Sequence, residues 1–130
     1  MATFAYTILY VPDVTAAIEF YERAFGFARK FITPDNDYGE LLTGATTISF
    51  VGRALAESNL SKGFELSTPG GKPFGIELGF TTDDVQALID QAVAAGGELY
   101  APPVEKPWGQ TVAYVRDLNG FLIEICTPMG

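Results

Sequence analysis

The sequence carries one order of elements twice, and this repeat limits the folds that the chain can adopt. Residues 71 positions apart match at the start and at the end of an amphipathic stretch in each half. The offset aligns Tyr6 with Glu77, Asp13 with Asp84, Val14 with Val85, Ala24 with Ala95, and Gly26 with Gly97. In both halves a strand-like run comes before the aspartate, and a glycine follows the stretch with helical spacing. Duplication of one strand and helix unit explains this shared order better than chance does.

The first half predicts a strand, a helix and three further strands. The apolar and β-branched residues 4–11 are typical of a strand, and Asp13 is placed to cap the helix behind it. Apolar residues then recur at helical spacing until Gly26, which stands where a C-cap glycine belongs. Three short strand-like runs follow at residues 27–33, 38–42 and 46–51.

The second half predicts the same order. A strand is expected at 74–81, and Asp83 with Gln86 three residues later resembles a capping box that starts a helix. Its expected core face is Val85, Leu88, Ile89, Ala92 and Val93. Strands are expected at 98–101, 110–115 and 121–127, with a proline-rich bend at 102–107 and a turn at 117–120.

The two halves predict an α+β fold of two βαβββ modules within one domain, residues 1–130. The modules are expected at 1–52 and 74–130, joined by a linker at 53–73 that shows neither helical nor strand period. Two curved, mixed four-stranded sheets, each backed by a helix, would then surround a cavity. Because such sheets leave edges and an apolar face uncovered, we expect a homodimer.

Composition excludes several classes of partner and of chemistry. Sixteen acidic and eight basic residues give a formal charge of −8, the wrong sign for nucleic acid or an anionic membrane. A neutral or cationic small molecule is the expected partner.

The chain has no histidine, so it offers no imidazole base and no histidine metal ligand. A single cysteine, Cys126, allows no internal disulfide, and the first residues show no leader, so we expect a cytoplasmic protein.

Strand alternation places two glutamates on one side of the predicted sheet. In residues 121–127 the apolar Phe121, Ile123 and Ile125 share one face, which leaves Glu124 on the other. In residues 74–81 the same alternation turns Glu77 away from the helix, between two glycines. Both carboxylates are therefore predicted to face a common cavity.

The motifs in their order resemble those of the glyoxalase, bleomycin-resistance and extradiol-dioxygenase superfamily, also called vicinal oxygen chelate proteins. The first motif is Leu9-x-Val11-x-Asp13 with Ala17, Phe20-Tyr21 and Gly26-Phe27, and the second is Trp108-Gly109-Gln110 with Arg116-Asp117, Gly120 and Glu124. The resemblance covers nearly the whole chain. It implies paired βαβββ modules, a ligand cavity inside the sheet and a dimer.

The resemblance also implies where metal ligands would lie. Carried over position by position, they fall on Tyr6, Ser49, Glu77 and Glu124, and of these only Glu124 is a common ligand type in the family. A histidine-dependent extradiol dioxygenase is not expected, because it needs two imidazoles. No cofactor or transition metal is expected; a divalent ion, if held by Glu77 and Glu124, would be Mg²⁺ or Mn²⁺.

Two functions remain open at this point. In the first, a binding protein takes up a partly aromatic or cationic molecule, with Glu77 and Glu124 as counterions, Tyr6 and Trp108 as apolar or stacking contacts, and Ser49 in the lining. In the second, a glyoxalase-like lyase or isomerase uses Glu77 and Glu124 as metal ligands or as a general base. We rank binding above catalysis, because a pair of carboxylates without a metal suits the binding of a cation.

Overall fold

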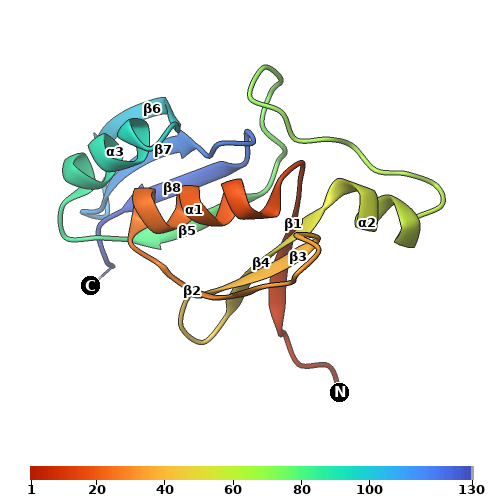
Figure 1. Ribbon diagram of the computed structural model, residues 1–130. Helices are drawn as coiled ribbons and strands as arrows, with labels where there is room; N and C mark the ends of the chain where they lie inside the picture. Colours follow the sequence, from red (N-terminus) through yellow and green to blue (C-terminus); the bar gives the residue numbers. More distant parts are fainter. Residues whose placement is uncertain (130) are drawn as a thin grey trace. The chain divides into compact units, whose positions relative to one another are not determined.

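The structure is a computed structural model that describes residues 1–129, and it contains two four-stranded mixed sheets and three helices (Figure 1). The α+β class and the duplicated βαβββ order predicted from the sequence are confirmed. The contacts within the chain divide it into two compact units, which we describe separately. None of the helices formed by residues 1–129 is long and apolar enough to cross a membrane.

The first unit comprises Met1–Glu22 and Gly26–Leu66. Its elements are β1 (Tyr6–Val11), α1 (Val14–Phe25), β2 (Ala28–Ile32), β3 (Tyr38–Leu42), β4 (Thr47–Gly52) and α2 (Arg53–Asn59). The strands lie in the order β1-β4-β3-β2, with β1 parallel to β4 and the other pairs antiparallel. The sheet thus combines one parallel crossover with a meander.

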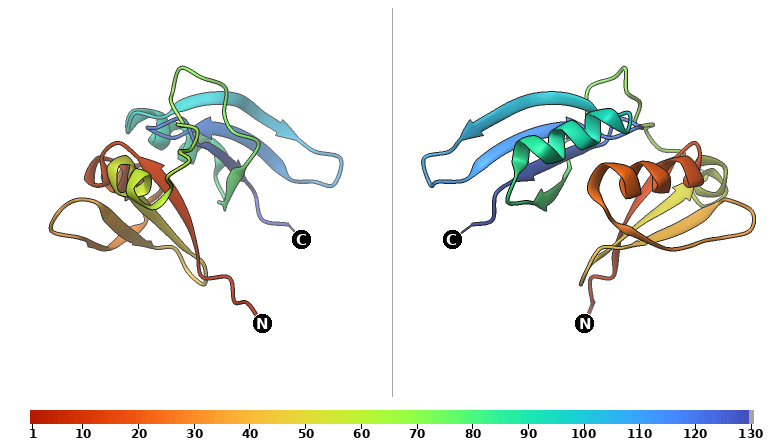
Figure 2. Two further views of the ribbon diagram at one scale, coloured as in Figure 1. Left: turned by 90° about the vertical axis from the view of Figure 1, so that its right-hand side faces the viewer. Right: turned by 60° about the vertical axis from the view of Figure 1, so that its left-hand side comes forward.

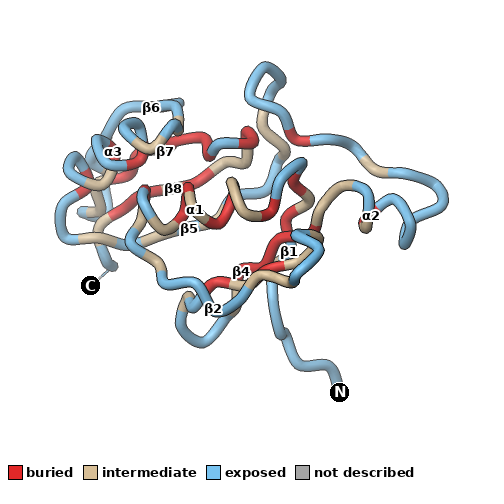
Figure 3. Tube along the Cα trace, in the orientation of Figure 1, coloured by how far each residue is buried: buried red, intermediate tan, exposed pale blue. Residues whose placement is uncertain are grey.

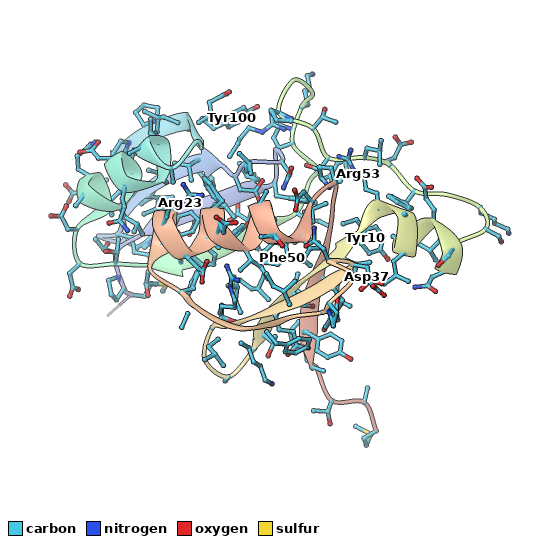
Figure 4. All side chains as sticks on the ribbon, in the orientation of Figure 1. Tyr10, Arg23, Asp37, Phe50, Arg53 and Tyr100 are labelled. Carbon is cyan, nitrogen blue, oxygen red and sulfur yellow. The ribbon has the colours of Figure 1, made fainter. Side chains whose placement is uncertain are left out.

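Helix α1 begins and ends where the sequence predicts. The Asp13 carboxylate accepts a hydrogen bond from the backbone N–H of Ala16 at 3.2 Å, and Gly26 ends the helix at a φ of 76°. The buried face of α1 packs on β4, where the ring of Tyr21 meets that of Phe50 edge to face at 5.1 Å. Phe50 is labelled below α1 in Figure 4. This packing leaves the opposite face of the sheet free of the helix.

The second unit comprises Arg23–Phe25, the last turn of α1, and the described residues from Ser67 onward. Its elements are β5 (Glu77–Thr81), α3 (Val85–Ala94), β6 (Glu98–Glu105), β7 (Thr111–Arg116) and β8 (Leu122–Cys126). The strand order β5-β8-β7-β6 repeats that of the first sheet, with β5 parallel to β8. Helix α3 lies against β6, β7 and β8 (Figure 2). The buried residues of this sheet lie on β7 and β8, whereas β6 is almost entirely exposed (Figure 3).

Three sequence predictions about the second half and the linker are wrong in detail. The residues after Gly52 form the short helix α2, although they show no clear helical period. Strand β5 starts at Glu77 and not at residue 74, so Ile76 lies before the strand and is exposed. Val93 is also exposed, so the apolar face of α3 is narrower than the sequence indicates.

The start of α3 and the course of β6 differ from expectation for clear physical reasons. The cap is Asp84, whose carboxylate accepts from the N–H of Ala87 at 3.0 Å, while the Gln86 amide donates to Asp90 and forms no capping box. Strand β6 continues through the prolines predicted to bend it. It can do so because it is an edge strand, and its register with β7 shifts where Pro102 and Pro103 lack a donor.

A buried arginine anchors the segment that leads into β5. The guanidinium of Arg116, only 4% exposed, donates to the Gly120 carbonyl from Nε at 3.0 Å and from Nη2 at 2.9 Å. It also donates to the carbonyls of Thr68 at 3.0 Å, Pro69 at 3.1 Å and Gly71. We call this set the Arg116 clasp. It ties residues 68–71 to the turn between β7 and β8.

Candidate ligand-binding site

Two glutamates occupy the face of the second sheet that is turned away from α3. Ile123 and Ile125 of β8 are fully buried on the helix side, so the alternation of the strand places Glu124 on the opposite face. Strand β5 runs parallel to β8 in unbroken register, with Gly79 opposite Glu124 and Glu77 two residues earlier. Glu77 and Glu124 are therefore diagonal neighbours on one open face.

The two carboxyl groups interact directly. The pKa of Glu77 is raised from its ordinary value, first by partial desolvation and then by a hydrogen bond with Glu124 and by the charge of that neighbour. A hydrogen bond between two carboxyl groups requires a proton on one of them. Glu77 therefore holds its proton at a higher pH than a solvated glutamate does.

Tyr114 completes this cluster, and sequence reasoning missed it. It is the direct cross-strand partner of Glu124 on β7, and its hydroxyl donates to Oε1 of Glu124 at 3.3 Å. The pKa of Tyr114 is raised, first by burial and then by the charges of Glu77 and Glu124. The sequence contains an indication of this role. The turn predicted at 117–120 pairs the strands on either side of it, and counting outward from that turn places residue 114 opposite residue 124.

Cys126 lies beside the same cluster and is chemically inert. The residue is buried, and burial together with a hydrogen bond to Glu124 raises the pKa of its thiol to about 11. At neutral pH the sulfur is therefore protonated and is neither a nucleophile nor a good metal ligand. We call Glu77, Glu124 and Tyr114 the carboxylate cluster.

The matching face of the first unit carries different chemistry. Ser49 of β4 corresponds to Glu124, and its side chain is fully buried with an Oγ that lacks a well-formed hydrogen bond. Beside it, the Tyr38 hydroxyl donates to Oε2 of Glu40 at 2.6 Å, and Nζ of Lys30 lies 3.5 Å from Oε1 of Glu40. Tyr6 of β1 is half-exposed. The carboxylate of this unit is thus already paired with a cation.

Trp108 belongs to the loop between β6 and β7. Its indole Nε1 donates to Oε1 of Gln110 at 2.7 Å, and the Gln110 amide donates to the carbonyl of Thr127 at 2.8 Å. The side chain remains 64% exposed. The structure therefore gives Trp108 a clear local anchor and leaves most of its ring open to solvent.

The sequence of the chain was also compared with protein families. The family model described as the Glyoxalase/Bleomycin resistance protein/Dioxygenase superfamily matches residues 3–125. The chain belongs to this superfamily. The membership agrees with the duplicated strand order of the two units.

Curated relatives and solved structures of the superfamily resemble the chain at low identity. A lactoylglutathione lyase of Arabidopsis thaliana and a probable lactoylglutathione lyase of Vibrio cholerae are each 28% identical over 127 residues. The matches cover 94% and 92% of this chain, but 43% of the Arabidopsis protein and 86% of the Vibrio protein. The chain thus spans less than half the length of the Arabidopsis relative.

Solved structures show the same fold. A superfamily enzyme from Burkholderia phytofirmans gives a TM-score of 0.82 at 27% identity, covering 97% of this chain and 98% of that chain. A glyoxalase-related enzyme from Fulvimarina pelagi gives a TM-score of 0.80 at 23% identity, covering 98% and 89%. These likenesses support the glyoxalase-like fold of the two units.

Members of the superfamily often use a divalent metal, and the donor groups of this chain test whether such an ion fits. Glu77 and Glu124 offer hard carboxylate oxygens, whereas Ser49 offers an enclosed hydroxyl and Tyr6 a phenol, both weak ligands. No group of three histidine, cysteine, aspartate or glutamate side chains within residues 1–129 could hold a metal ion. Without imidazole or thiolate, these residues are poor ligands for Zn²⁺, Ni²⁺ or Fe²⁺, whereas Glu77 and Glu124 offer two hard carboxylates to Mg²⁺ or Mn²⁺.

Proposed function

We propose that the open face of the second sheet binds a small, cationic and partly aromatic molecule at Glu77 and Glu124, without a tightly held transition metal. The observation that carries this proposal is the position of the two glutamates, which are diagonal neighbours on a sheet face that the helix does not cover. Two carboxylates this close repel each other when both are ionised. A ligand ammonium group relieves the same repulsion as the proton does.

The charges around the cluster favour this ligand class. The chain carries a formal charge of −8, which draws cations toward it, and no lysine or arginine lies within the carboxylate cluster. In the first unit, by contrast, Lys30 already pairs with Glu40. An ammonium group that donates a charge-assisted hydrogen bond to Glu124 would offset the negative charge of the pair. Glu77 could then lose its proton without repulsion.

The aromatic part of the ligand has partners in the second unit. The ring of Tyr114 stands beside Glu124, and the exposed Trp108 supplies a further stacking surface on the neighbouring loop. Tyr6 and Ser49 belong to the first unit. The proposed contacts of the ligand are therefore limited to the second unit.

Titration calorimetry with benzylamine as the probe tests this function. Benzylamine carries an ammonium group at neutral pH, whereas benzyl alcohol has the same ring without the charge. We expect benzylamine to bind more tightly than the alcohol, and Glu77→Gln or Glu124→Gln to weaken it by about tenfold to a hundredfold, the equivalent of a charge-assisted bond. Glu57→Gln, on an exposed residue of α2, is the matched control. Equal binding of both probes, or losses as large in the control, would contradict the proposal.

A second candidate function is supported by the curated relatives. Both are lactoylglutathione lyases or probable ones, and a glutamate with a raised pKa suits a general base for proton transfer. In this alternative Glu77 accepts a proton from a bound substrate. Turnover of lactoylglutathione, measured with and without added Mg²⁺ or Mn²⁺, tests it. Turnover that is lost in Glu77→Gln would place catalysis above binding, whereas no turnover under any condition would remove this candidate.

We also propose that the chain forms a homodimer. Strands β1, β2, β5 and β6 are sheet edges with unpaired backbone groups, and Tyr6 and Ile8 expose large side chains on the edge strand β1. Light scattering tests this assembly. A monomer at every micromolar concentration would contradict it.

A further inference from the structure

Gly79 lies beside Glu124 of the carboxylate cluster, on the edge strand β5, and its own chain gives no reason for a glycine there. Its backbone does not have a positive φ, and a Cβ built on it would meet no heavy atom within 4 Å. The register between β5 and β8 is unbroken on both sides of it, so no bulge accounts for the residue. A side chain would fit both the conformation and the local packing.

The internal repeat supplies a direct comparison. Gly79 pairs with Glu124, which pairs in turn with Tyr114; in the first unit Ile8 pairs with Ser49, which pairs with Glu40. Ile8 therefore holds the position of Gly79 in the other module. Its side chain is 39% exposed, so the fold accepts a branched residue at this point of the edge strand.

A glycine inside a strand weakens the strand, and where there is no bulge or sharp bend it is typical of a place where a ligand or another backbone approaches closely. The space above Gly79 is bordered by the two groups that the proposed ligand needs. Glu124 lies directly across on the neighbouring strand, about 4.8 Å away, and Glu77 lies roughly 7 Å along the same strand.

We propose that Gly79 determines the shape of the ligand: its missing side chain lets a flat ring lie against the backbone of β5 while the attached ammonium group reaches Glu77 and Glu124. This inference rests on the binding function proposed above. For a ligand with one ring, it places that ring over β5 and not over Tyr114, which lies on the other side of Glu124. It adds that the ligand has a planar group close to its positive charge. A larger side chain at residue 79 occupies the place of the ring and leaves both carboxylates intact.

The variants Gly79→Ala, Gly79→Val and Gly79→Leu test this role, with benzylamine and methylamine as probes. We expect benzylamine to bind progressively more weakly along the series, with a loss of roughly tenfold or more for Val and Leu. Methylamine, which lacks a ring, should keep its affinity. Thr81→Leu, on the same strand and at the next position of the same face, is the matched control and should bind benzylamine as the parent protein does.

The outcomes separate this inference from the function on which it rests. If the parent protein does not prefer benzylamine to benzyl alcohol, the binding function fails and this inference fails with it. If the preference is present but Gly79→Leu keeps the full affinity for benzylamine, the inference alone is overturned. It is also overturned if the substitutions change the oligomeric state and not the affinity, because Gly79 would then face a second copy of the chain. NMR titration of Glu77 in each variant verifies that the carboxylate pair is unchanged.

Discussion

Tyr114 and Glu124 face each other directly across the antiparallel pair of β7 and β8, with the phenol donating to the carboxylate at 3.3 Å. This bond gives Glu124 a fixed neutral donor on one side, while Glu77 meets it from β5 on the other. The carboxylate cluster thus spans three strands of one sheet. Its protonation depends on all three side chains.

Replacing Glu124 by Gln should lower the pKa of Glu77 toward its ordinary value, because the neighbouring charge disappears while partial desolvation remains. The pKa of Glu77 is higher in the folded than in the unfolded chain. Its stabilising contribution is therefore fully present below the unfolded pKa and is lost as the pH rises through the raised folded value. Carboxyl-carbon NMR and urea unfolding from acid to neutral pH measure both effects.

We expect the melting temperature of Glu124→Gln at neutral pH to equal or exceed that of the parent protein, since the substitution relieves repulsion. Glu57→Gln should leave the titration of Glu77 unchanged. Marked destabilisation by Glu124→Gln would instead mean that Glu124 has a structural role.

Replacing Tyr114 by Phe removes only the phenolic hydroxyl. The carboxylate pair should then have a higher apparent pKa, because the phenol no longer helps to hold the negative charge. The free energy of unfolding should fall by about 0.5–1.5 kcal/mol, the usual value of one hydrogen bond. An unchanged titration of Glu77 in Tyr114→Phe would show that the 3.3 Å contact is energetically weak.

Replacing Arg116 by Lys should destabilise the second unit strongly. A lysine ammonium is a point charge and cannot reach four backbone carbonyls that the planar guanidinium satisfies together. We expect a loss of about 2–4 kcal/mol in urea unfolding, since several carbonyls lose their donor. Arg53→Lys in the first unit provides a comparison at an arginine that is only half-buried.

Replacing Gly120 by Ala tests the same clasp from the opposite side. Gly120 has a φ of 89°, and a Cβ on it would lie 2.4 Å from the carbonyl oxygen of Thr68. The substitution should push residues 68–71 away from Arg116. The positive φ at residue 120 should by itself cost an alanine about 1 kcal/mol or more of unfolding free energy. A smaller loss in Gly120→Ala would mean that the clasp is looser than described.

Cys126 should resist alkylation in the folded protein. A thiol pKa of about 11 leaves little thiolate at neutral pH, and the side chain is buried beneath the carboxylate cluster. Mass spectrometry after iodoacetamide treatment should show slow labelling in buffer and rapid labelling in urea. Equally rapid labelling under both conditions would contradict the burial of the thiol.

The sequence predicts those parts of the fold that follow local periodicity. The capping aspartate and the terminal glycine define α1, and alternation in β8 places Glu124 opposite the helix because Ile123 and Ile125 must be buried. Glu77 follows from the same rule. These features depend on neighbours within a few residues, which a pattern can show.

Other features depend on tertiary contacts, and the sequence does not reveal them. Strand β6 passes through Pro102 and Pro103 because it is an edge strand, which only the strand order shows. Helix α2 contains strong helix formers, but seven residues are too few for a stable isolated helix, and its contacts with β4 and β1 support it. Tyr114 joins the site through register, which becomes certain only once β7 and β8 are paired.

The Arg116 clasp has a further consequence for how the protein responds to its surroundings. Its acceptors are main-chain carbonyls, which neither gain nor lose a proton, and a guanidinium keeps its charge at every physiological pH. Acidification therefore leaves the clasp intact, and dissolved salt screens it weakly because it is enclosed. The glutamate pair can exchange its proton while the segment leading to Glu77 stays anchored. Protonation of the cluster and the anchoring of the backbone beside it are thus independent of each other.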